Sequence, residues 1–140
     1  MKLEELFNQY RNLRKEELVK EGRRVYSALG AGMSKKGYSQ KEVLGFATML
    51  VRLAAGADNF GSEAEFELFQ AVTEIKSDIY EFKAMVRNSE EEGFVAAIDE
   101  VVDSLDKELK EAALRFAALF FAVDNHLNQR EADLFKRLEA

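Results

Sequence analysis

The sequence contains no cysteine and no proline, and it has a single histidine. Without cysteine the chain can form neither a disulfide nor a thiolate ligand, which is typical of a protein from a reducing compartment. The absence of proline removes the residue that most strongly breaks a helix interior. The sequence also lacks a glycine-rich phosphate loop and any set that would complete a Ser-His-Asp or Cys-His arrangement, so we predict that the protein is not an enzyme.

Long apolar runs are missing as well. The first ten residues carry charges where a signal peptide needs an apolar block. The uncharged stretch over residues 43–51 is far shorter than the roughly 20 residues that span a bilayer. We therefore expect a cytoplasmic protein with no membrane insertion. A length of 140 residues with 47% hydrophobic and 33% charged residues predicts one globular domain over residues 1–140.

Charge is unevenly distributed along the chain. Residues 1–52 contain 11 Lys and Arg against 6 Asp and Glu, whereas residues 53–140 contain 9 against 20. Glutamates are interleaved with the basic residues of the first part. We therefore interpret that part as a solvated helix face that complements the acidic remainder, and not as a nucleic-acid surface.

One stretch of the sequence is used twice. Residues 41–72 and 107–138 align without a gap and match at nine positions. Each copy has an apolar run, an Asp-Asn pair, a short polar loop, a capping residue and a second apolar-periodic run, which predicts a helix–loop–helix unit. Helical spacing continues outside the copies and no strand pattern competes with it. The predicted fold is an all-α, single-domain bundle of seven to eight helices that contains these two helix–loop–helix repeats.

Capping boxes predict where several helices begin, because the cap side chain and a Glu three residues later satisfy amides at the helix start. The boxes are Ser39 with Glu42, Ser62 with Glu65, Ser89 with Glu92, and Asn128 with Glu131. Before the first box, we expect one or two helices that end at the glycines of residues 30–32, followed by a basic linker over residues 33–38. A long helix from about Asp106 to Val123, apolar on all sides at its end, is expected to be central and buried.

The Asp-Asn loops contain the candidate site. Asp58 and Asp124 each lie in the last turn of a helix, at the negative end of its dipole and beside unpaired carbonyls. With Glu65 and Glu131 they would form an all-oxygen cluster that suits a hard divalent cation. If the two copies pack about an approximate two-fold axis, both loops lie towards one end of the bundle.

A purely structural interpretation of these loops stays open. The two glutamates then act only as capping residues, and each aspartate begins an Asx-type turn. Asn59 and Asn125 follow a helix end, where a left-handed residue is needed and Asn is second only to Gly.

The doubled loop pattern resembles the TerB-like family of tellurite-resistance proteins, whose hallmark is a repeated Ala-Asp-Gly loop. Asp58, Glu65, Asp124 and Glu131 stand in the acidic positions of that family. The resemblance covers about residues 39–138. It implies an all-helical domain of bacterial stress operons with no established enzymatic activity, and a divalent cation (Ca²⁺, Mg²⁺ or Zn²⁺) bound by the acidic loops. We expect such a protein to act through protein partners.

The sequence departs from the family pattern in three ways. Asn replaces the loop Gly in both copies, Phe60 and His126 stand where the family often has Glu, and Gly61 replaces a hydrophobic residue in the first copy. These departures bear on metal affinity more than on the fold. His126 is either a solvated side chain or a further ligand beside Asp124.

The repeat alignment predicts a shared core. Six leucine and phenylalanine residues match between the copies, and we expect all of them to be buried: Leu53, Leu68, Phe69, Leu119, Leu134 and Phe135. Truncation of Phe69 or Phe135 to Ala should lower the free energy of unfolding by about 3–5 kcal/mol in denaturant melts. Losses below about 1 kcal/mol in both variants would contradict the alignment.

Overall fold

The computed structural model describes residues 2–56, 63–76, 78–81, 83, 100–125, 127, 133 and 135–139. Its elements are α1 (Leu3–Tyr10), α2 (Lys15–Lys35), α3 (Gln40–Gly56), α4 (Glu63–Thr73), α7 (Lys107–Val123) and the 3-10 helix η2 (Lys136–Leu138). No strand occurs among the described residues, so the all-α fold class is confirmed for them. The single domain over residues 1–140 stays a prediction.

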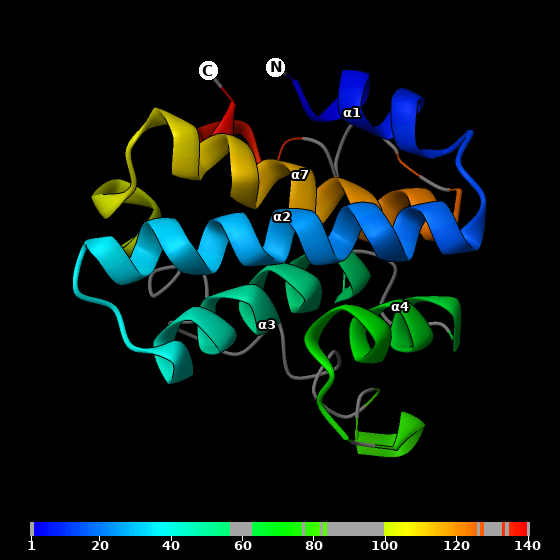
Figure 1. The fold of residues 1–140 in the computed structure, drawn as a ribbon. Helices are drawn as coiled ribbons and strands as arrows, with labels where there is room; N and C mark the ends of the chain where they lie inside the picture. The colour runs from blue at the N-terminus through cyan, green and yellow to red at the C-terminus, as the bar shows by residue number, and fades with distance from the viewer. Residues whose placement is uncertain are drawn as a thin grey trace.

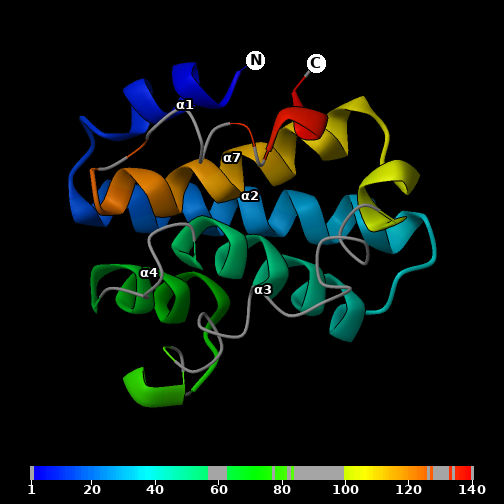
Figure 2. The same cartoon turned by 180° about the vertical axis from the view of Figure 1, so that it is seen from behind.

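Helix α7 is the centre of the molecule, and α1, α2, α3, α4 and η2 all pack against it (Figures 1 and 2). Asp106 caps its start, where the carboxylate accepts a hydrogen bond from the Leu109 N–H at 2.9 Å. Residues 116–122 are each at most 5% exposed, so the prediction of a central, buried helix is confirmed. None of the helices in the described part of the chain is both long and apolar enough to cross a membrane.

The core predicted from the repeat alignment is confirmed where it can be seen. Four of the six matched residues are at most 4% exposed: Leu68, Phe69, Leu119 and Phe135. The side chains of Leu53 and Leu134 lie outside the described residues. The confirmed residues come from α4, from α7 and from the turn before η2, and all belong to one hydrophobic cluster.

Helix α2 is longer than the sequence suggested. We expected it to end at the glycines of residues 30–32, but it continues to Lys35 and buries Met33 completely. Gly32 is a point of close approach, because a Cβ there would lie 2.3 Å from Cδ2 of Leu109 on α7. The helix ends at Lys35, and Gly37, directly after the cap residue Lys36, has a φ of 97°, the left-handed conformation that glycine adopts without strain.

Helix α3 begins with the predicted capping box. The Glu42 N–H donates to Ser39 Oγ at 3.1 Å, and the Ser39 N–H donates to Glu42 Oε1 at 3.0 Å. Helices α3 and α4 begin at Gln40 and Glu63, directly after the cap positions 39 and 62 that the sequence predicts. The other predicted boxes include residues outside the described ones, namely Ser62, Ser89 with Glu92, and Asn128 with Glu131.

The two copies of the repeat agree in their first helices and differ in their described ends. Helices α3 and α7 run in the same direction, and α4 begins at the end of the bundle where α7 ends (Figures 1 and 2). In the first copy α4 continues to Thr73, whereas the matching residues of the second copy form the 3-10 helix η2. The two-fold relation between the copies is therefore not confirmed.

Two glycines of α2 should respond oppositely to alanine. A Cβ on Gly22 would lie 2.5 Å from Cγ2 of Val72, a β-branched side chain with little freedom to rotate. We expect Gly22→Ala to lower the free energy of unfolding by about 1–2 kcal/mol. A Cβ on Gly30 would lie 3.7 Å from Cγ1 of Val43, an ordinary contact. Gly30→Ala should raise that free energy by up to about 1 kcal/mol. Equal stability of the two variants in urea melts would contradict the close approach of α2 and α4.

Candidate functional site

Glu65 is the one buried charged side chain among the described residues, with 3% of its surface exposed. It lies in the first turn of α4, where the capping-box pattern places it. Glu42 occupies the same position in the box of α3 and is exposed. Capping therefore does not require burial, and the burial of Glu65 has to be stabilised by whatever surrounds its carboxylate.

Asp124 follows the last residue of α7 and is half-buried. Its neighbour Asn125 has a φ of 52°, and its N–H donates to the Ala122 carbonyl at 2.9 Å. The predicted left-handed Asn after the helix is thus confirmed in the second copy. Asp124 lies where the carbonyl ends of the helix accumulate negative charge, which disfavours a carboxylate unless a cation or a donor is near.

The predicted four-residue metal set cannot be assembled from the described part of the chain. Asp58, Glu131 and His126 lie outside the described residues. Among the residues that are described, no group of three or more His, Cys, Asp or Glu side chains is placed to hold a metal ion. Glu65 and Asp124 come from elements that begin and end at the same end of the bundle (Figure 2). The cation site stays a prediction.

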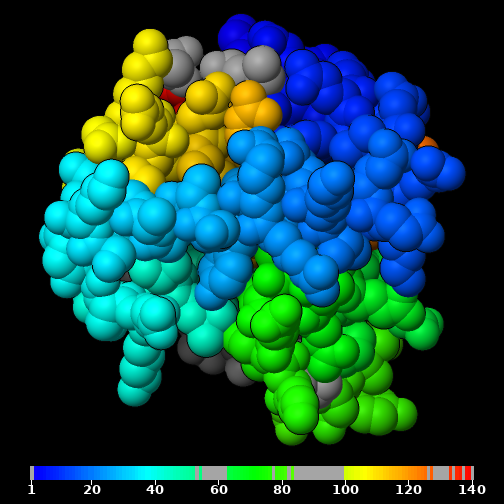
Figure 3. Space-filling view, in the orientation of Figure 1, coloured from blue at the N-terminus to red at the C-terminus, as the bar shows by residue number. Residues whose placement is uncertain are grey.

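A groove on another face was not foreseen from the sequence. It lies between α2, the first turns of α3 and the end of α4, and has a volume of about 850 Å³. Figure 3 shows it as a hollow below α2, between the cyan start of α3 and the green α4. Its lining comes from α2 (Arg23, Tyr26, Ser27, Gly30, Ala31 and Ser34), from α3 (Gln40, Val43 and Leu44) and from the end of α4 (Val72, Thr73 and Glu74).

The walls of the groove are held in place by contacts between the helices. Arg23 Nε donates to the Ala71 carbonyl in the last turn of α4 at 2.9 Å. The ring of Tyr26 packs on Phe116 of α7, with the ring centroids 5.9 Å apart. Partial burial raises the pKa of the Tyr26 phenol, so its hydroxyl stays protonated and available as a donor at neutral pH.

Glu74 gives the groove a strained edge. Its φ of 61° is in the left-handed region, which costs free energy for a residue other than glycine or asparagine. The conformation closes α4, because the Glu74 N–H donates to the Gln70 carbonyl at 2.8 Å. The sequence did contain one sign of the groove. Gly30 and Ala31, which line the groove, belong to the stretch that we interpreted as the end of a helix.

A second polar cluster joins α1, α2 and α7. The Tyr10 hydroxyl donates to Glu21 Oε2 at 2.9 Å and accepts a hydrogen bond from Arg115 Nη1 at 3.3 Å. Burial is the main cause that raises the pKa of Tyr10 to about 12, so the phenol acts as a donor and not as a base. The hydrogen bond from Arg24 holds the pKa of Glu21 below its usual value. This cluster is a structural clamp between three helices.

The chain matches no protein-family model, and neither a curated protein nor a solved structure is significantly similar to it. The likeness of the Asp-Asn loops to the TerB-like family therefore stands on the loop residues alone.

The clamp predicts how stability depends on pH. The pKa of Glu21 is lower in the folded protein than its unfolded value near 4.5. The stability that Glu21 contributes is therefore present above the unfolded pKa and is lost as the pH falls through the folded pKa. Glu21→Gln should lower the free energy of unfolding by about 1–2 kcal/mol at pH 7. At pH 3 the free energies of unfolding of Glu21→Gln and wild type should differ by less. Glu16→Gln, an exposed change of the same charge on α2, is the control and should have little effect. A deficit of equal size at both pH values would contradict the role of the ionised carboxylate.

Proposed function

We propose that the chain is a TerB-like module without enzymatic activity that serves a bacterial stress response in the cytoplasm. In this proposal its acidic loops bind a divalent cation weakly, and the helical body binds protein partners. Ca²⁺, Mg²⁺ and Zn²⁺ are the candidate ions. The proposed ligands are Asp58, Glu65, Asp124 and Glu131.

The burial of Glu65 carries this proposal. A carboxylate is costly to remove from water, and it is stabilised by partners at its oxygens. Glu65 already interacts with other groups of the chain, and a cation would be a further partner. The comparison within the chain is direct, because Glu42 does the capping work of the same motif while exposed. Oxygen ligands of this kind are those that Ca²⁺ and Mg²⁺ prefer.

The directions of the helices support the same proposal. Asp124 ends α7, and Glu65 lies in the first turn of α4 at the same end of the bundle. Like charges gathered at one end destabilise a fold unless a cation or a basic group lies between them. A cation that bridged the two loops would also tie the last turn of α7 to the start of α4.

The alternative function is a protein-interaction module that holds no metal, in which the acidic residues only cap helices. The complete capping box at Ser39 and Glu42 favours it, since the same residue pattern is there fully explained by hydrogen bonds to the helix start. Cation-dependent stability separates the two functions.

Thermal melts with millimolar Ca²⁺, Mg²⁺ or Zn²⁺ at fixed ionic strength test the cation site. At about 100 times the dissociation constant, binding to the folded state should add roughly 2.7 kcal/mol per site. The double variant Asp58→Asn with Asp124→Asn should lose most of this gain, and Glu65→Gln should reduce it. Glu42→Gln is the matched control and should keep the full gain, because it changes a capping glutamate that is not in the proposed set.

The quantity compared is the shift that the cation produces in each variant, so a lower starting stability of Glu65→Gln does not confuse the result. If wild type shows no shift with any of the three ions, or if the double variant shifts as much as wild type, the cation function is wrong. The module without metal is then the function that stands.

A further inference from the structure

Helix α1 is held in place by a helix that lies far along the chain. It packs on α7 and not closely on α2, although α2 follows it directly in the sequence (Figures 1 and 2). An isolated helix as short as α1 is barely stable in water, so α1 depends on the surface that α7 offers it. That surface depends on α1 in return, because apolar side chains on both helices meet water if α1 moves away. The buried residues of α1 are Leu3, Leu6, Phe7 and Tyr10.

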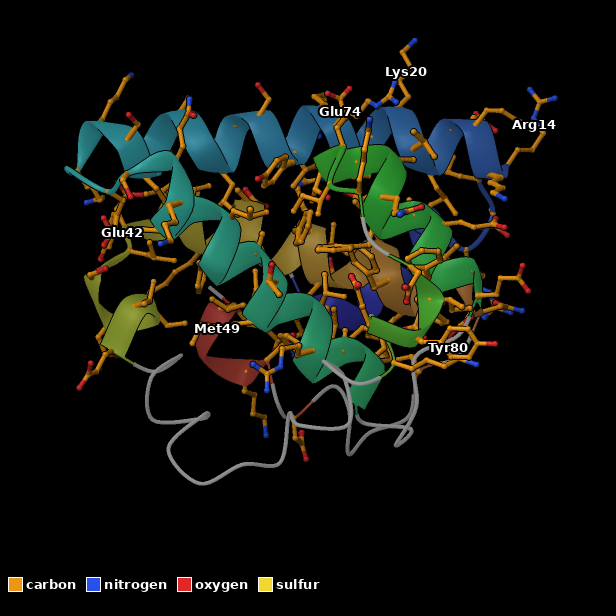
Figure 4. All side chains as sticks on the ribbon, turned by 90° about the horizontal axis from the view of Figure 1, so that it is seen from below. Arg14, Lys20, Glu42, Met49, Glu74 and Tyr80 are labelled. Atoms are coloured by element: carbon orange, nitrogen blue, oxygen red, sulfur yellow. The ribbon has the colours of Figure 1, made fainter. Side chains whose placement is uncertain are left out.

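The sequence contains no strong signal that separates α1 from α2. Residues 11–14, which we call the hinge, include neither glycine nor proline. Arg14, at the N-cap position of α2, has no oxygen in its side chain that could accept a hydrogen bond from the helix start. Its side chain is 83% exposed and extends outward at the start of α2 (Figure 4). A local contact that favours the break is the hydrogen bond from the Arg14 N–H to Glu17 Oε1 at 3.0 Å, which is exposed to solvent.

The backbone of the hinge departs from a helix over few residues. Arg11 has helical φ and ψ of −60° and −21°, and its N–H donates to the carbonyl four residues before it at 2.9 Å. The Leu13 N–H donates to the carbonyl three residues before it at 3.0 Å, a bond of the 3-10 type. At Arg14 the backbone is extended, with a ψ of 163°. A change of conformation over residues 12–14 therefore suffices to join α1 and α2 into one helix over residues 3–35.

We propose that α1 exchanges between two copies of this chain. In the exchanged dimer the hinge is helical, α1 continues the axis of α2, and each α1 packs on α7 of the other copy. Tyr10 of each copy then completes the polar cluster of the other, where it donates to Glu21 and accepts a hydrogen bond from Arg115. The second copy is the occupant that fits, because the surface under α1 is complementary to α1 itself and a further copy supplies an identical helix. The proposal uses no residue of the acidic loops.

The hinge and the protein concentration decide between the monomer and the exchanged dimer. The contacts of α1 are the same in both forms, so they favour neither. The dimer gains the backbone hydrogen bonds of a continuous helix over the hinge, and it loses the bond from Arg14 to Glu17. Conversion requires α1 to leave α7 and to expose its apolar face. The two forms should therefore convert slowly and should be separable.

A proline at position 15 distinguishes the two forms. Lys15 is the first residue of α2, where proline is favoured, and Arg14 before it has the extended backbone that a following proline requires. In one continuous helix the same proline lies in the interior, where it removes a hydrogen bond and collides with the preceding turn. Lys15→Pro should therefore fold as a monomer and prevent the exchange. Lys15→Ala is the matched control, because it removes the same exposed ion pair with Glu67 and is compatible with both forms.

The measurement is refolding from urea at about millimolar concentration, followed by size-exclusion chromatography with light scattering. Wild type and Lys15→Ala should give a dimer whose fraction rises with the concentration during refolding and persists on dilution. Lys15→Pro should lower the dimer fraction at least about tenfold. A thermal melt shows whether Lys15→Pro is folded, and the distance measurement on the wild-type hinge decides the question if it is not.

Spin labels follow the path of the chain in the dimer. The chain has no cysteine of its own, so labels can be attached through Glu4→Cys on α1 and Ala28→Cys on α2, both at exposed positions. In one continuous helix the two positions are about 36 Å apart at 1.5 Å per residue. In the monomer they should be closer, because α1 turns back over α7 (Figure 1). Labelled chain is refolded in an excess of unlabelled chain, so that the measured distance lies within one chain.

Three results would overturn the proposal. The first is the absence of a dimer from both wild type and Lys15→Ala at every refolding concentration. The second is a dimer of folded Lys15→Pro as abundant as that of Lys15→Ala. The third is the short distance of the monomer in the wild-type dimer, which would show association through outer surfaces with α1 in place. A cation-independent melt would refute the metal site and leave the exchange untouched, so the two failures are distinguishable.

Discussion

A helix segment that is apolar on every side is stable only when other elements enclose it, and residues 116–122 of α7 place that constraint on the elements around them. The rings of α7 pack on one another, on α2 and on the turn before η2. The ring centroid of Phe116 lies 5.2 Å from that of Phe120 within the helix and 5.9 Å from that of Tyr26 on α2. The ring centroids of Phe121 and of Phe135, before η2, are 5.5 Å apart. Each such pair adds about 0.5–1.5 kcal/mol beyond burial. The remaining described helices therefore pack around α7 and cover its apolar surface.

Helix α2 covers one side of α7 and also forms one wall of the groove. Its glycines at 22 and 32 bring it close to Val72 of α4 and to Leu109 of α7. Helix α2 also contacts both α3 and α4. The groove is the space that remains between α2, the start of α3 and the end of α4. Asp124 after α7 and Glu65 in the first turn of α4 lie at one end of the bundle, whereas the groove lies beside the start of α3 and the end of α4.

Local rules explain what could be predicted from the sequence. The Ser39–Glu42 box, the central burial of α7 and the left-handed Asn125 follow from caps, periodicity and backbone preference, which act over a few residues. The extent of α2 could not be predicted this way, because Gly32 is explained only by Leu109, a residue far along the chain. The groove was missed for the same reason. Its walls come from three helices, and small residues on α2 alone do not indicate what faces them.

Native-state hydrogen exchange, measured residue by residue, tests most directly whether enclosure of α7 organises the fold. Amides over residues 113–122 should exchange only through global unfolding, with opening free energies equal to the value from denaturant melts. Amides over residues 43–47, at the edge of the groove, should exchange through smaller openings. If the α7 amides are protected no better than those of α3, α7 is not the element on which the structure depends.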